Sequence, residues 1–150
     1  MGRCWSLINK REVCRLKIPF PNIESGLAIK AHMQICIDPV KNQFLTCQTA
    51  RPHLAKPGRP PFNYVIEIPD LERTPFQHPT LIDCDKSFEL SEQVEVLARA
   101  KTALRPDICE ELFLTLLHKI NHDKFRIIKI QLDELETLNP AYIKRTASRS

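Results

Sequence analysis

Short strand-like segments follow one another closely through the first two-thirds of the chain, and this spacing limits the folds that it can adopt. Five such segments are bounded by proline, glycine and other turn residues: residues 13–20, 31–37, 43–49, 63–68 and 80–84. A doubly wound α/β sheet would place a long helix between successive strands. Strands without intervening helices favour a sandwich or a small barrel instead.

The segments 31–37 and 43–49 are expected to form a β-hairpin. Each segment has the length and the β-branched or aromatic content of a strand. The five-residue connection between them begins with Asp38-Pro39, a typical turn signal. Two strands joined by so short a connection usually pair with each other.

From Ser91 the pattern changes to helical periodicity. A short helix is expected over residues 91–101, and a longer helix opens after Pro106. Asp107 is its expected N-cap, with Glu110 three positions further on as in a capping box. Apolar residues then recur on one face, which should pack against the sheet. This stripe contains Ile108, Leu112, Leu116 and Ile120, widened by Phe113 and Leu117.

A last strand at residues 125–130 is expected to close the domain. The sequence therefore predicts one α+β domain over residues 1–138, with a β-rich N-terminal part and an amphipathic helix near the C-terminus. Residues 139–150 carry Lys144, Arg145 and Arg149 among small polar side chains. They are expected to form a flexible basic tail.

Charge, cysteine content and hydropathy restrict the class of protein. The formal net charge of +4 is compatible with a polyanionic partner. The six cysteines include no Cys-x-x-Cys pair and are widely spread, so reduced structural thiols are expected rather than a disulfide scaffold. No segment approaches the roughly 20 apolar residues that span a bilayer, and no signal peptide is evident, so a cytoplasmic protein without membrane contact is expected.

Two pairs of side chains have the spacing of metal ligands. His118 and His122 lie one helical turn apart, but no Glu follows His118 and no third ligand is indicated, which favours an ordinary exposed helix face. Asp83 and Asp85 flank Cys84, and on a strand both would point to one side. They could hold Mg²⁺ or act in acid–base chemistry, although a solvated strand end is the simpler interpretation. Neither a metal ion nor another cofactor is expected.

A long basic loop is expected at residues 50–62, which are rich in proline and contain no acidic residue. Loops of more than about 12 residues are usually functional or disordered. The predicted hairpin would bring Lys30 and His32, at the start of its first strand, close to Thr49 at the end of its second. The basic loop follows directly and carries Arg51, His53, Lys56 and Arg59.

These residue types suit the cleavage of RNA through its own 2′-hydroxyl. That reaction needs a base for the hydroxyl, a cation or donors for the charge on the phosphorane, and an acid for the departing 5′-oxygen, but no metal. Lys30, His32, Thr49 and His53 include these chemical types. The alternative is that the basic side chains solvate loops and that Thr49 is an ordinary strand residue.

Four motifs follow one another along the chain. They are Leu16-Lys-Ile-Pro-Phe-Pro-Asn-Ile-Glu-Ser-Gly26, Lys30 leading into the strand to Ile37, Thr46-Cys-Gln-Thr49, and Thr80-Leu-Ile-Asp-Cys-Asp-Lys86. Together they resemble the MazF/PemK (Kid-like) toxin family over roughly residues 13–125. In this alignment Lys30 takes the place of the family's catalytic arginine, Ala31 that of its proline, and Thr49 that of its catalytic hydroxyl.

The resemblance implies a small SH3-like β-barrel of about five to six strands with a C-terminal helix. It also implies a homodimer that cleaves single-stranded RNA without a metal and is neutralised by a cognate antitoxin protein. For this reaction we expect Lys30 to stabilise the phosphorane, Thr49 to position the phosphate, and His32 to carry a proton. The loop residues Arg51, His53, Lys56 and Arg59 would bind the RNA backbone. The family's Arg-Gly-Asp opening is replaced here by Lys10-Arg-Glu-Val-Cys14, and a lysine lacks the planar fork of an arginine.

Two other functions remain open at this point. The chain could be a non-catalytic RNA- or protein-binding relative, such as a degenerate toxin or an accessory protein of a phage or mobile element. In that case Lys56-Pro-Gly-Arg-Pro-Pro61 could dock a partner in extended polyproline geometry. A metal-dependent nuclease that uses Asp83 and Asp85 is the third interpretation.

Overall fold

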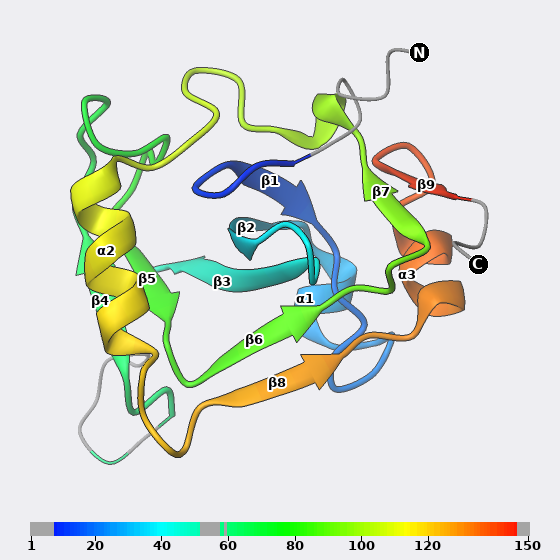
Figure 1. Cartoon of the computed structure of the whole chain (residues 1–150), viewed down its shortest axis with the longest axis horizontal. Helices are drawn as coiled ribbons and strands as arrows, with labels where there is room; N and C mark the ends of the chain where they lie inside the picture. The colour runs from blue at the N-terminus through cyan, green and yellow to red at the C-terminus, as the bar shows by residue number, and fades with distance from the viewer. Residues whose placement is uncertain (1–7, 52–57, 59, 147–150) are drawn as a thin grey trace.

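The computed structural model describes residues 8–51, 58 and 60–146 of the 150-residue chain. Within these residues a seven-stranded, mostly antiparallel sheet and a separate two-stranded sheet are accompanied by short helices (Figure 1). The predicted α+β class is therefore confirmed. The elements are β1 (Val13–Leu16), α1 (Gly26–Ile29), β2 (His32–Asp38), β3 (Gln43–Thr49), β4 (Tyr64–Glu67), β5 (Thr80–Asp83), β6 (Lys86–Glu89), β7 (Val94–Val96), the 3₁₀ turn η3 (Ala98–Ala100), α2 (Glu110–Lys119), β8 (Arg126–Lys129), α3 (Leu132–Leu138) and β9 (Ile143–Arg145).

Strands β2 and β3 form the predicted hairpin. They pair antiparallel, with Gln34 opposite Thr46. The Asp38 carboxylate accepts hydrogen bonds from the next two free backbone N–H groups of the turn, both at 3.0 Å, which is the usual role of Asp in a tight connection. Strand β1 pairs with the other edge of β2, where Leu16 lies opposite His32.

The outer edge of β3, which is the edge that faces away from β2, pairs with two strands in succession. Near its start, Phe44 lies opposite Phe88 of β6, and at its end Thr49 lies opposite Thr80 of β5. Strand β6 was not among the predicted strands. Because β5 and β6 run end to end along β3, the chain turns a corner between them at Asp85. Strand β4 then pairs antiparallel with β5, and β8 pairs in parallel with β6, so the sheet divides and does not close into a hydrogen-bonded ring.

The Asp85 carboxylate stabilises this corner. It accepts hydrogen bonds from the backbone N–H groups of Phe62 at 2.6 Å and Asn63 at 3.0 Å, and from the Asn63 side-chain amide at 2.9 Å. The Cys84 N–H donates to the Asn63 carbonyl at 2.9 Å. Burial opposes the ionisation of Asp85, but the hydrogen bonds favour the charged form, and the pKa of Asp85 lies below its ordinary value. The chain entering β4 is therefore tied to the corner between β5 and β6.

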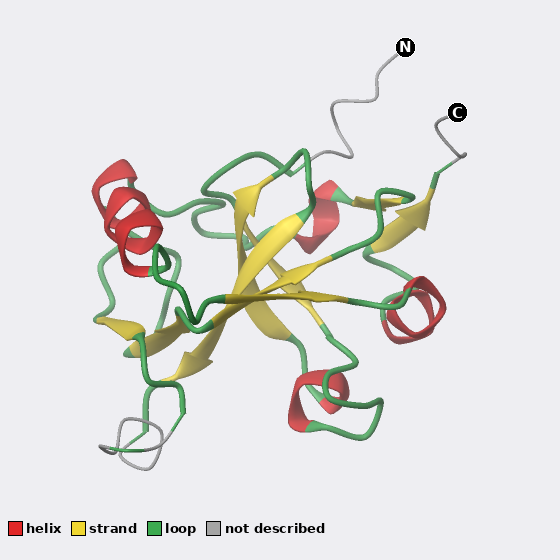
Figure 2. Cartoon of the chain, turned by 60° about the horizontal axis from the view of Figure 1, so that its bottom comes forward, coloured by secondary structure: helices red, strands yellow, loops and turns green. Residues whose placement is uncertain are grey.

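The large sheet carries a buried core on each face. Since alternate strand residues point to opposite sides, Val13, Ile35 and Leu45 pack toward α2, whereas Leu16 and Phe44 pack toward β7, β9 and α3. Figure 2 shows the helices distributed around the sheet rather than gathered in one layer. None of the helices that the structure describes has the length and apolar character needed to cross a membrane.

Helix α2 begins later than predicted and has a different cap. The predicted N-cap, Asp107, instead forms an ion pair with Arg105 at 2.9 Å, so the capping box is absent. Cys109 is the N-cap, and its Sγ accepts a hydrogen bond from the Leu112 N–H at 3.4 Å. Leu117 is 37% exposed and does not belong to the stripe. The stripe is buried, as predicted, at Ile108, Leu112, Phe113 and Leu116.

The helix predicted for residues 91–101 is wrong. Strand β7 occupies Val94–Val96, all three residues are buried, and only the single turn η3 follows. Val96 lies opposite Ile143 of β9. The β-branched valines suit a strand, and pairing with a segment that lies about 50 positions further along the chain outweighs the helical spacing.

The C-terminal segment, expected as a flexible tail from residue 139, is folded up to residue 146. Asn139 is 2% exposed, and its side chain pairs with both backbone groups of Lys17. Its Oδ1 accepts from the Lys17 N–H at 2.8 Å, and its Nδ2 donates to the Lys17 carbonyl at 2.8 Å. These two hydrogen bonds are like those that a neighbouring strand would make to Lys17, and they fix α3 and β9 to the end of β1. Residues 147–150 lie outside the described residues.

Replacing Asn139 by alanine should lower the free energy of unfolding by about 2–4 kcal/mol, because two partly buried backbone groups of Lys17 lose their partners. Urea titration followed by circular dichroism measures the loss. Asn121→Ala is the matched control, since Asn121 is exposed, and it should change the stability by less than about 0.5 kcal/mol. Equal small losses in the two variants would contradict this role of Asn139.

Candidate functional site

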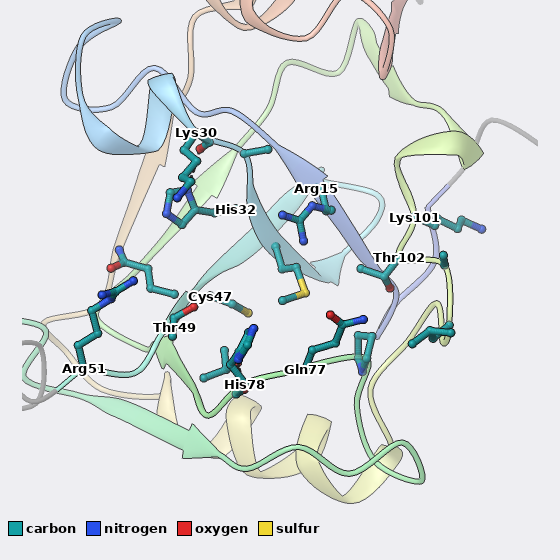
Figure 3. A pocket seen from close by; sticks show the side chains of 17 residues that line it. Arg15, Lys30, His32, Cys47, Thr49, Arg51, Gln77, His78, Lys101 and Thr102 are labelled. Atoms are coloured by element: carbon teal, nitrogen blue, oxygen red, sulfur yellow. Dashed lines mark hydrogen bonds between the residues drawn. The ribbon is translucent and has the colours of Figure 1, made fainter.

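A pocket of about 780 Å³ opens where β2 begins, β3 ends and β5 begins (Figure 3). Four of the predicted site residues line it together: Lys30, His32, Thr49 and Arg51. The hairpin therefore brings them to one place, as its predicted geometry required. The remaining loop residues, His53, Lys56 and Arg59, lie outside the described residues.

Backbone pairing fixes this end of the sheet. Thr49 is the last residue of β3 and lies opposite Thr80, the first residue of β5. One step further, the Ala50 N–H donates to the Pro79 carbonyl at 2.8 Å. Because β2 and β3 are antiparallel, the start of β2 lies beside the end of β3, on the edge of β3 away from β5. The exposed Thr49 hydroxyl thus stands at a rim to which three strands contribute.

His32 is held in one orientation and in one tautomer. Its Nδ1 lies 2.8 Å from the Lys30 carbonyl oxygen. A carbonyl can only accept, so Nδ1 carries the proton of this bond, and in the neutral ring Nε2 is left with its lone pair. Burial lowers the pKa of His32, and the cations of Lys30 and Arg15 lower it further, against the opposing effect of the hydrogen bond to the carbonyl. The imidazole is therefore poised as a proton acceptor.

The charge of the pocket is positive. Arg15, Lys30, Arg51 and Lys101 all line it, and no Asp or Glu is among the described lining residues. Lys101 is compensated by Glu12, whose carboxylate lies 3.1 Å from its ammonium group. The other three cations have no ion pair within the described part of the chain. Such a concave site favours an anion such as a phosphate group.

Three basic or imidazole side chains that line the pocket were not predicted: Arg15, Lys101 and His78. Arg15 is the exposed residue of β1, and its position was visible in the sequence as the polar member of the alternation from Cys14 to Leu16. Lys101 follows η3, and His78 precedes β5. Only the long-range pairing of these two segments places both residues at the pocket. No local signal identifies them.

Cys47 also lines the pocket but is not a nucleophile. Only 2% of it is exposed, and burial raises the pKa of its thiol well above the ordinary value. Burial likewise raises the pKa of Cys36 and Cys84 to about 12. The cysteines that the structure describes are free, as expected, and these three are protonated thiols within the core.

A smaller pocket of about 320 Å³ adjoins the first. His32 and Gln48 line both pockets, so these two side chains form the ridge between them. Phe20, Ser25 and Lys86 line the second pocket, and the Lys86 ammonium lies 5.9 Å from the centre of the Phe20 ring. A polymer that lies across this ridge could therefore reach both pockets.

The carboxylates of Asp83 and Asp85 are structural. The Asp83 carboxylate forms an ion pair with Lys86 at 2.7 Å, and Asp85 is occupied by the hydrogen bonds at the sheet corner. Neither residue lines the large pocket. The residues that the structure describes contain no group of three or more His, Cys, Asp or Glu side chains able to hold a metal ion.

The two helix-spaced histidines do not converge on a common site. His122 Nε2 lies 3.0 Å from the Cys84 carbonyl oxygen, and its ring packs edge-on against Phe125. His118 is exposed on α2. His122 therefore supports the sheet corner from the loop after α2, which is a structural role.

Comparisons with known proteins give no relative from which a function could be transferred. No family model matches the chain, and neither a curated protein nor a solved structure matches it. The resemblance to the MazF/PemK family therefore depends on the sequence motifs alone.

Protonation of His32 should destabilise the folded protein. The pKa of His32 is lower in the folded state than in an unfolded chain, so the unfolded state binds more protons and stability rises with pH through this range. Wild-type protein should therefore lose stability as the pH falls below about 6.5, and His32→Gln should lose less. Urea unfolding at pH 7.5, 6.5 and 5.5 measures this, with His118→Gln as the control. The same pH dependence in wild type and His32→Gln would contradict it.

Proposed function

We propose that this chain is a metal-independent endoribonuclease that cleaves single-stranded RNA. The observation that carries the proposal is the convergence of Lys30, His32, Thr49 and Arg51 in one cationic pocket without a described carboxylate in its lining. Each of the chemical types that 2′-hydroxyl cleavage requires is present there. The metal-dependent alternative has less support, because Asp83 and Asp85 are engaged in structural contacts and neither lines the large pocket.

In the proposed reaction the RNA supplies its own nucleophile. The 2′-hydroxyl attacks the adjacent phosphorus, and its proton moves to His32 Nε2. The bond from phosphorus to the 5′-oxygen breaks, and that oxygen takes up a proton from a general acid. The products are a 2′,3′-cyclic phosphate and a 5′-hydroxyl. Lys30 and Arg51 stabilise the negative charge that grows on the phosphorane oxygens. The Thr49 hydroxyl donates a hydrogen bond that positions the phosphate.

The substrate class follows from the shape of the site. The pocket lies at the rim of the sheet and continues over the His32–Gln48 ridge into the second hollow. A single strand can turn its phosphate toward the cations while a base leaves the stack and enters a neighbouring hollow. A duplex keeps its bases stacked and paired, so it fits this arrangement poorly.

The proposal extends to a divergent relationship with the MazF/PemK toxins. A small SH3-like barrel is the finer fold that we propose, and the mostly antiparallel sheet of short strands is compatible with it. Homodimer formation and control by a cognate antitoxin belong to the same proposal. They rest on the sequence resemblance.

A non-catalytic protein-binding role is the alternative, and the edge strand β4 favours it. Strand β4 ends the hydrogen-bonded order of the sheet. Ile66 within it is 44% exposed, and Ile68 just after it is 69% exposed. An extended peptide could add to this edge through backbone hydrogen bonds. This role would not need the cationic pocket.

Purified protein should cleave a long single-stranded RNA in excess chelator and leave 2′,3′-cyclic phosphate ends. Thr49→Ala and Lys30→Ala should each reduce the rate constant about 10²–10³-fold, as is typical for removal of a group that stabilises developing charge. The matched controls are Thr115→Ala on α2 and Lys41→Ala in the β2–β3 turn, and both should retain wild-type rates. Intact RNA with the wild-type protein would refute the nuclease proposal, as would full activity of Lys30→Ala and Thr49→Ala.

RNA binding should weaken steeply as salt increases. Each phosphate neutralised on a single strand contributes about −0.7 to the slope of log K against log salt. Arg51→Ala should therefore make the slope shallower by about 0.7. The control is Arg126→Ala, which should leave the slope unchanged because Arg126 is an exposed residue of β8 that lines neither pocket. Fluorescence anisotropy with an oligonucleotide at four salt concentrations measures both. An affinity independent of salt would show that the cationic pocket does not contact the RNA backbone.

A further inference from the structure

The pocket contains a second imidazole, that of His78, on the side opposite His32. His32 opens β2, and His78 lies two residues before β5. Strand β3 runs between β2 and β5 and pairs with both. Two strand spacings of about 5 Å each separate the two backbones across the sheet. The register also displaces His78 by about three residues along the strand direction. Figure 3 shows the side chains of His32 and His78 on opposite sides of the pocket, with Cys47 of β3 between them.

The backbone of His78 is held in place while its ring is left available. The Thr80 hydroxyl donates to the His78 carbonyl at 2.8 Å, and the next carbonyl, that of Pro79, accepts from the Ala50 N–H at 2.8 Å. The side chain itself is exposed and lines the pocket. Within the described part of the chain, no group hydrogen-bonds to its imidazole ring.

We infer that His78 is the general acid of the proposed RNA cleavage and that His32 is its general base. This inference rests on the proposed function. As the 2′-oxygen forms its bond to phosphorus and gives its proton to His32 Nε2, the bond to the 5′-oxygen breaks and the His78 imidazolium gives its proton to that oxygen. His32 ends the step protonated and His78 ends it neutral, and proton exchange with water restores both rings before the next turnover.

The position of the two rings matches the geometry of this reaction. In an in-line displacement the attacking and leaving oxygens lie on opposite sides of the phosphorus, so the base and the acid must approach from opposite sides. His32 and His78 lie on opposite sides of the pocket (Figure 3), and the proposed reaction places the phosphate between them, beside Thr49 at the end of β3. The roles are assigned by the bond of His32 Nδ1 to the Lys30 carbonyl, which leaves His32 Nε2 as an acceptor. His78 is the other imidazole among the described residues of the pocket.

A change of leaving group separates the acid from the base. An RNA in which sulfur replaces the bridging 5′-oxygen releases a thiolate, which needs no proton in order to leave. The His78→Gln variant should cleave ordinary RNA about 10²–10⁴-fold more slowly than the wild type, which is the usual contribution of a positioned acid or base. It should cleave the sulfur-substituted RNA at close to the wild-type rate. His32→Gln should be slow on both substrates, because the 2′-hydroxyl still has to lose its proton.

His118→Gln on α2 is the matched control, and His78→Asn is a second variant at the same exposed position; circular dichroism melting curves verify the fold of each variant. If the His78→Gln and His78→Asn variants each lost the same factor in cleavage rate on both substrates, His78 would not be the group that protonates the leaving group. Wild-type rates of both variants on ordinary RNA would equally overturn the inference, while the proposed function would stand. Failure of the wild-type protein to cleave either RNA would instead refute the proposed function, and the inference with it.

Discussion

The shared outer edge of β3 is the constraint on which the rest of the structure depends. Because β6 takes the first part of that edge and β5 the last part, the chain must turn a corner at Asp85, and the sheet must divide beyond it. The hydrogen bonds that Asp85 accepts stabilise the corner. The same pairing sets Thr49 beside Thr80 and so brings the segment with His78 to the end of the hairpin. The division of the sheet and the pocket at its rim thus have one cause.

The fold was predictable where the interactions are local. The hairpin of β2 and β3 follows from two strand-like runs and a five-residue connection, and the buried stripe of α2 follows from its periodicity. Strand β6 was missed because Lys86–Glu89 contains a single apolar residue. The helix expected at residues 91–101 and the tail expected from residue 139 were wrong for another reason. There, pairing between β7 and β9, and between Asn139 and Lys17, joins distant segments, and no local pattern reports such contacts.

The candidate site shows the same limit. Lys30, His32, Thr49 and Arg51 were found because all four lie at the ends of one predictable hairpin. Arg15 was visible in the sequence as the polar residue of β1, but only the pairing of β1 with β2 brings it to the pocket. His78 precedes β5 and reaches the pocket only through the pairing of β5 with β3. For Asp83 and Asp85 the sequence suggested a role that the structure does not support. Their spacing allowed a metal or acid–base pair, whereas their hydrogen bonds and ion pair stabilise the sheet corner. Residue type and spacing thus indicated the chemistry of the site, but only the fold determined its members.

The central claim is that the pocket at the end of β2, β3 and β5 is where RNA binds. The most direct test is an amide NMR titration with a single-stranded oligoribonucleotide whose 2′-hydroxyls are methylated to prevent cleavage. The account predicts that the largest chemical-shift changes fall on residues 30–33, 47–51 and 77–80, and that they diminish in Arg51→Ala. Changes confined to β4 and its neighbours, or no changes at oligonucleotide excess in low salt, would contradict it.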